Sequence, residues 1–185
     1  MSAPPIVLQV VLIALVLAAA VFDLRSRKIP NWLSLAGVLA GLGLNVAIAG
    51  WPGLWFSLQG LGLALLVYFP LFLLRAMGAG DGKLMAAVGA LVGPANWFGI
   101  FVVTSVAGAV LGLLAAAKHA RLRRTFENLY FILVSLRLKQ APYEANPELD
   151  VQSSHALRLP HAVSIAVGTL TFLAVAVLNP RLLPW

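Results

Sequence analysis

Residues 6–22 read IVLQVVLIALVLAAAVF, an apolar run with Gln9 as its one polar residue, and the run ends at the carboxylate of Asp23. As a helix, a run of this length spans roughly 25 Å, most of the hydrocarbon core of a bilayer. Four further runs of similar length follow, at residues 32–49, 54–74, 97–117 and 160–178. The sequence therefore predicts an all-α, polytopic helical membrane protein that forms one membrane-embedded domain over residues 1–185.

The composition supports this class of protein. The chain is 61% hydrophobic and only 10% charged, whereas soluble domains carry about a quarter charged residues. It has no cysteine, which excludes disulfides, thiolate nucleophiles and cysteine-based zinc sites. The net charge is +7, but the basic residues lie between apolar runs, as expected from membrane topology rather than from a nucleic-acid-binding surface. We expect no nucleic acid partner, no metal and no cofactor.

One further apolar run, residues 84–92, is short. As a helix it extends about 14 Å, only half of the bilayer core. Either it joins residues 76–81 to complete a span, or it is a half-helix inside a protein-lined cavity. The third run contains Gly62, which we expect to pack against a neighbouring helix, so that a leucine there would reduce protein abundance.

The basic side chains gather in three connections, at residues 25–28, 75–83 and 118–158, whereas the turns at residues 50–53 and 93–96 carry no charge. The positive-inside rule places the basic connections in the cytoplasm and the N-terminus outside. Six spans give all of these connections a consistent side. The sequence therefore predicts about six transmembrane helices.

Residues 118–159 form the one long polar connection. Within it, residues 125–138 place apolar side chains at helical spacing: Phe126, Leu129, Tyr130, Leu133 and Leu136. This spacing, with basic residues around it, predicts a cytoplasmic amphipathic helix at the membrane interface. Residues 141–154 hold two prolines and several acids, which favours a loop.

Two of the six acidic residues stand apart from this polar connection. Asp23 and Asp81 lie at the predicted cytoplasmic ends of spans, and a carboxylate at membrane depth is costly, so both are functional candidates. Two carboxylates that share a site do not both ionise readily, so one can act as a base while the other is an acid. They form a candidate catalytic pair of the aspartic-protease kind. Taken alone, Asp23 also fits an interfacial residue beside Arg25.

Asp81 lies within a glycine-rich segment, Gly78-Ala-Gly80-Asp81-Gly82-Lys83. Glycines here would let an extended peptide backbone approach the carboxylate and would permit the turn that starts a helix. The dipole of that helix would favour an anion at Asp81. The candidate substrate-binding residues are therefore Gly78, Gly80, Gly82 and Lys83, although a segment of this kind also fits a simple helix-breaking turn.

The order of these motifs, Asp23 followed by Ile29-Pro30-Asn31 and then by residues 78–84, resembles the type IV prepilin peptidase family. Those aspartic membrane proteases carry an Asp before Ile-Pro-Asn, and a Gly-x-Gly-Asp-x-Lys. The resemblance covers residues 6 to about 117. It implies that Asp23 and Asp81 are catalytic. It also implies that the chain cleaves the short basic leader from prepilin and pseudopilin precursors, after a glycine, at the cytoplasmic face of a bacterial inner membrane.

Larger members of that family carry an extra cytoplasmic domain with paired cysteines and N-methyltransferase activity, which nothing here matches. The short form resembles the peptidases of tight-adherence (Flp) pilus systems, so we expect cleavage without methylation. Three alternatives stay open: a proton-coupled small transporter, a non-catalytic subunit of a pilus or secretion complex, and a signal-peptide-type intramembrane aspartyl protease. The transporter alternative predicts inverted repeats, and none is evident in this sequence. The signal-peptide-type family has a tyrosine where this chain has Phe22, which weighs against that alternative. The sequence carries no signal for an oligomeric state.

Overall fold

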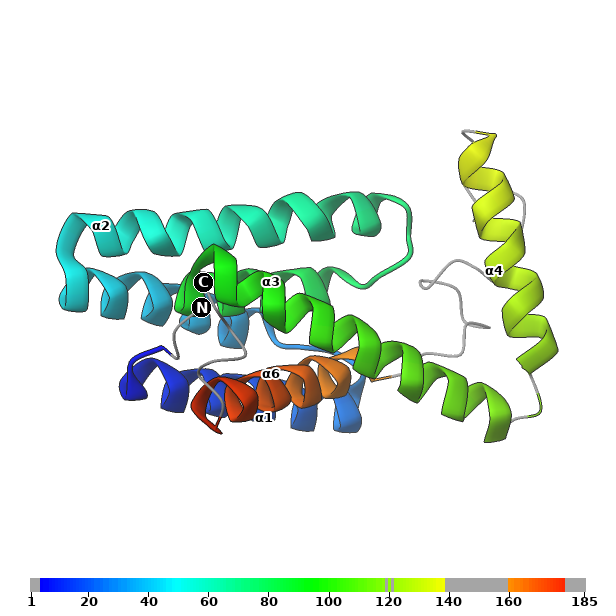
Figure 1. Ribbon diagram of the computed structural model, residues 1–185, viewed down its shortest axis with the longest axis horizontal. Coiled ribbons are helices and arrows are strands. Elements are labelled where there is room, and N and C mark those ends of the chain that lie inside the picture. The colour runs from blue at the N-terminus through cyan, green and yellow to red at the C-terminus, as the bar shows by residue number, and fades with distance from the viewer. Residues whose placement is uncertain (1–3, 119, 121, 139–159, 179–185) are drawn as a thin grey trace.

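The computed structural model describes residues 4–118, 120, 122–138 and 160–178. Every regular element in these residues is a helix: α1 Ile6–Ser26, α2 Asn31–Leu73, α3 Ala79–Lys118, α4 Leu122–Arg137 and α6 His161–Leu178. In Figure 1, α1, α2, α3 and α6 lie lengthwise along the bundle, and α4 stands across one end of it. Those four helices are long and apolar enough to cross a membrane. The prediction of an all-α membrane protein is confirmed.

Helix α2 is broken at Gly50 and doubles back on itself (Figure 1). The φ of Gly50 is 61°, in the left-handed region that glycine adopts without a steric cost. The Ser57 hydroxyl donates a hydrogen bond of 3.2 Å to the carbonyl of Gly41, so the two halves of α2 pack antiparallel. The break lies in the turn expected at residues 50–53.

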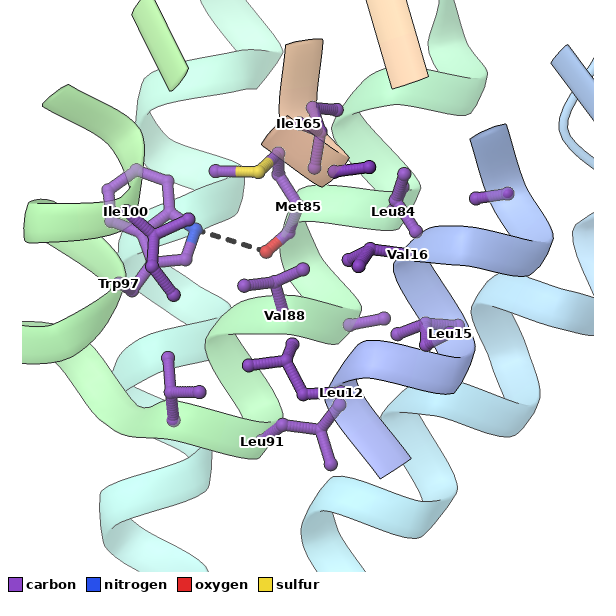
Figure 2. Packing of buried hydrophobic residues seen from close by; sticks show 14 of the residues in the cluster. Leu12, Leu15, Val16, Leu84, Met85, Val88, Leu91, Trp97, Ile100 and Ile165 are labelled. Atoms are coloured by element: carbon purple, nitrogen blue, oxygen red, sulfur yellow. Dashed lines mark hydrogen bonds between the residues drawn. The ribbon is translucent and has the colours of Figure 1, made fainter. Parts of the chain in front are cut away.

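Helix α3 is broken in the same way at Gly93, whose φ is 72°. The Trp97 indole N–H donates to the carbonyl of Met85 at 3.0 Å (Figure 2), which ties the second half of α3 to the first. Gly93 lies against the ring of Phe56, six residues beyond Gly50 along α2. At 1.5 Å per residue, six residues correspond to about 9 Å along the helix axis, so the break of α3 lies about 9 Å before the level of the turn of α2.

The first half of α3 contains the short apolar run but takes in only the last three of residues 76–81, so it does not by itself complete the span predicted as one of the two options. It extends from Ala79 to the break, roughly 20 Å, less than the roughly 30 Å of the hydrocarbon core. Among the described residues, four helices are long and apolar enough to cross a membrane, and two of them are broken. That the bundle makes six separate crossings stays a prediction.

This first half of α3 is the centre of the bundle. Every residue from Leu84 to Gly93 is buried. Figure 2 shows side chains of α1, of the second half of α3 and of α6 around it; those labelled are Leu12, Leu15, Val16, Trp97, Ile100 and Ile165. A helix covered on all sides has no polar face, which explains why residues 84–93 are apolar or small throughout.

Helix α2 packs on this central segment through backbone contacts. A Cβ atom on Gly60 would overlap the carbonyl oxygen of Gly89, and one on Gly41 would lie 2.6 Å from the carbonyl carbon of Ala90. The Asn45 amide and the Ser57 hydroxyl donate to the Ala90 oxygen at 3.1 and 2.8 Å. Small residues and interhelical hydrogen bonds of this kind hold helices together in membranes.

Helix α6 packs on the second half of α3 through small residues as well. A Cβ atom on Gly168 would overlap Thr104, and one on Gly108 would lie 3.7 Å from Ser164. The contact residues are four positions apart on each helix, Thr104 and Gly108 on α3 and Ser164 and Gly168 on α6. Small residues at this spacing are typical of close-packed membrane helices. This contact holds α6 against α3 and thereby places the first turn of α6.

Helix α4 confirms the helix expected at residues 125–138 but begins earlier, at Leu122, and ends at Arg137. The side chains of Phe126, Leu129 and Leu133 are exposed. The predicted loop at residues 141–154 lies outside the described part of the chain.

The expectation for Gly62 is wrong. A Cβ atom there meets nothing within 4 Å, whereas Gly60, two residues earlier, faces the central backbone. The apolar run alone does not show which face of α2 turns inward.

These two glycines make a matched pair for a test of the packing. Gly60→Ala forces α2 away from the central segment, and we expect it to lower the free energy of unfolding by about 2 kcal/mol. We expect Gly62→Ala to change it by less than about 0.5 kcal/mol, because its side chain enters open space. Unfolding of the two variants in detergent measures the difference. Equal stability of the two would show that the close approach of α2 is not needed.

Candidate active site

Asp23 lies in the last turn of α1, and only 8% of it is exposed. Its Oδ2 atom accepts a hydrogen bond of 3.0 Å from the backbone N–H of Ala162, in the first turn of α6. The first N–H groups of a helix have no partner within the helix, so a carboxylate satisfies one of them. Two helices that are distant in sequence thus hold this carboxylate together.

Asp81 lies in the first turn of α3, as expected. Its backbone N–H donates to the carbonyl of Gly78 at 3.2 Å, and its side chain is half-buried. The charge of Asp81 interacts with that of Asp23. The structure therefore brings the two aspartates from separate helices into one site.

The two motifs also touch each other directly. The Lys83 ammonium donates a hydrogen bond of 2.9 Å to the side-chain oxygen of Asn31. A Cβ atom on Gly80 would lie 3.3 Å from the Cβ of Ile29. The segment after α1 and the segment that begins α3 therefore pack as one unit, and the face of Gly80 that lacks a side chain is turned toward Ile29.

The other two glycines of the motif have different neighbours. A Cβ atom on Gly78 would lie 3.3 Å from the Oδ2 atom of Asp81, and one on Gly82 would lie 3.4 Å from the Cβ of Tyr68. Among these glycines, Gly78 borders the carboxylate itself. Gly80 and Gly82 let neighbouring segments come close to it.

Sequence reasoning missed two residues of this site. Tyr68 of α2 is buried, its hydroxyl lies within range of the Asp81 charge, and its ring stands edge-on to Trp97. His161 opens α6, next to Ala162, and its imidazole lies within range of the Asp23 charge. The available signal was a titratable side chain inside or at the end of an apolar run, but either residue alone also fits a structural role.

Fold and site define a polytopic helical membrane protein with two carboxylates close together at helix ends. The chain belongs to the type IV leader peptidase family, whose model matches residues 10–113. This range includes both aspartates and ends before α4 and α6. Neither a curated protein nor a solved structure matches the chain. The family indicates a membrane protease of the leader-peptidase type.

The contact between Gly80 and Ile29 gives a test of how the motifs fit together. Gly80→Leu pushes Ile29 outward, and we expect it to lower the free energy of unfolding by about 1–3 kcal/mol. Ile29→Ala in the same chain removes the Cγ1 and Cδ1 atoms, which would lie 3.7 Å from a Cβ at position 80, but keeps the Ile29 Cβ, so we expect the double variant to recover part of this loss. Gly43→Leu is the control, because a Cβ there meets nothing within 4 Å. A double variant no more stable than Gly80→Leu would contradict this packing.

Proposed function

We propose that the chain, residues 1–185, is an aspartic endopeptidase that removes the short leader peptide from type IV prepilin and pseudopilin precursors at the cytoplasmic membrane face. The observation that carries this proposal is the interaction between Asp23 and Asp81, which meet from α1 and α3 in a chain of the leader peptidase family. Nothing in this chemistry calls for a metal ion or a cofactor.

The proposed reaction uses the two carboxylates in complementary protonation states. The ionised one accepts a proton from a water molecule as that water attacks the scissile carbonyl carbon, and the protonated one donates to the carbonyl oxygen. Two carboxylates at short range favour such a state, because ionising both is costly. Their surroundings differ, since Asp23 accepts the Ala162 amide while Asp81 lies beside Tyr68.

The position of the site at helix ends fits a substrate that must be extended to be cut. An extended peptide leaves backbone groups without partners in hydrocarbon, so the scissile bond has to lie outside the lipid. Gly78 borders Asp81 and would let that backbone approach. Gly80 and Gly82 allow the neighbouring segments to pack close to Asp81. We assign to the exposed Lys83 a contact with the leader peptide or with the membrane phosphates.

The proposed orientation of the chain in the membrane follows from the placement of its basic residues. Arg25, Arg75 and Lys83 are close in sequence to the two aspartate motifs, whereas the turn of α2 at Gly50 has no charge. We infer that the site faces the cytoplasm of a bacterial inner membrane, with the N-terminus outside and six crossings.

Helix α4 supports this orientation. It stands across the end of the bundle that carries the connection between α2 and α3 (Figure 1). If the long helices follow the membrane normal, α4 lies along the membrane surface. Its exposed Phe126, Leu129 and Leu133 are suited to the acyl boundary there.

Two isosteric variants test the catalytic pair. We expect Asp23→Asn and Asp81→Asn each to lower precursor cleavage by about 10²–10⁴-fold, because each amide removes the acid or the base. Both variants are expected to insert and fold, since an asparagine oxygen still accepts the hydrogen bond that holds Asp23. Glu127→Gln, on the exposed surface of α4, is the control and is expected to cleave normally. Normal processing by either aspartate variant would overturn the proposal.

Single cysteines test the orientation, because the natural chain has none. The variants Ser26→Cys, Ala49→Cys, Ala76→Cys and Ala95→Cys all replace exposed residues. In intact spheroplasts we expect a membrane-impermeant maleimide to label residue 49 quickly and residue 95 slowly, because the break of α3 is recessed. Residues 26 and 76 are expected to react only after lysis. Labelling of residue 95 only after lysis would mean that the first half of α3 does not cross.

A further inference from the structure

The first turn of α6 contributes to the site although it lies outside the family-matched residues 10–113. The Ala162 N–H reaches Asp23 across 139 positions of sequence. Pro160 precedes the helix and has no side-chain acceptor, so it cannot cap the turn. Asp23 therefore caps α6 from another helix.

The same hydrogen bond also stabilises the Asp23 carboxylate. The carboxylate lies in the last turn of α1, where the helix dipole disfavours an anion. It is buried, and among the described residues the Ala162 amide is the hydrogen-bond donor that it has. The positive end of the α6 dipole offsets the negative end of the α1 dipole at this position.

His161 adds a second interaction from the same turn. Its imidazole lies within range of the Asp23 charge, and its Cε1 atom would lie 3.9 Å from a Cβ on Gly108 of α3. Its buried Nε2 atom has no hydrogen-bond partner among the described residues. The sequence holds no other ionisable side chain between Lys83 and Lys118 or along the rest of α6. Asp23 is the ionisable group whose charge acts on His161. The other charged groups on the helices packed against α6 are Arg25 of α1 and Asp81, Lys83 and Lys118 of α3.

We propose that the first turn of α6 is a positioning element of the catalytic site, in which the Ala162 N–H orients the Asp23 carboxylate and the adjacent His161 imidazole interacts with that carboxylate. This rests on the proposed function, in which Asp23 is one of the catalytic pair. A carboxylate misplaced by about 1 Å loses on the order of 10²-fold in rate. Loss of this turn therefore lowers kcat rather than precursor binding.

A backbone substitution tests the amide alone. Replacing Ala162 by lactic acid during cell-free synthesis into nanodiscs turns its N–H into an ester oxygen and keeps the methyl group. The same exchange at Ala166, another buried alanine of α6, is the matched control. We expect the ester at residue 162 to lower kcat by about 10–100-fold with KM unchanged. The ester at residue 166 is expected to leave both within about two-fold while it lowers the thermal midpoint comparably.

A side-chain pair tests His161. Ser164 lies one turn further along α6 and packs on the same Gly108. We expect His161→Gln to lower kcat about tenfold, with KM unchanged, and to alter the pH profile of kcat, because it removes a titratable group beside Asp23. Ser164→Ala is expected to change stability only, with the profile of the natural enzyme.

The outcomes separate this inference from the proposed function. Natural kcat and pH profile in His161→Gln would overturn the role of that side chain, and equal kcat for the two esters would overturn the role of the amide. Neither result affects the catalytic pair as long as Asp23→Asn and Asp81→Asn are inactive. Normal cleavage by those aspartate variants would instead overturn the proposed function itself.

Discussion

The fold depends on the close approach of α2 to the first half of α3, where Gly60 meets Gly89 and Gly41 meets Ala90. In a bilayer the lipid tails are as apolar as leucine, so burial of apolar surface does not drive helices together. Contact between backbones and hydrogen bonds between helices do so instead. The Ala90 carbonyl illustrates both, since it lies against Gly41 and accepts from Asn45 and Ser57.

The site is built directly on this centre. The central segment that begins at Leu84 continues without a break from the first turn of α3, which carries Asp81. Helix α1 packs on the same segment through Leu12 and Val16 (Figure 2) and brings Asp23 to the site at its own last turn. The position of each carboxylate is thus set by a packed helix rather than by a free loop, and packed helices hold side chains more precisely than loops do.

The two carboxylates of the proposed catalytic pair have different surroundings, and such a difference favours one acid and one base. Asp23 accepts the amide of Ala162 at the start of α6, whereas Asp81 interacts with Tyr68 and borders Gly78. Because α6 lies beyond the matched residues 10–113, part of what holds Asp23 comes from a helix that the family match does not cover. In this chain, α6 both closes the bundle and completes the surroundings of the site.

The sequence by itself determined the helical membrane class, the two aspartate motifs and the turns at Gly50 and Gly93. These follow from local features: the length of apolar runs, the glycines and prolines between them, and the placement of charge. Only the tertiary structure decided that Gly60 rather than Gly62 packs, that Gly80 meets Ile29, and that α6 reaches Asp23. Which faces of two distant helices meet depends on how their surfaces fit together in three dimensions, and no local pattern in one sequence specifies that fit.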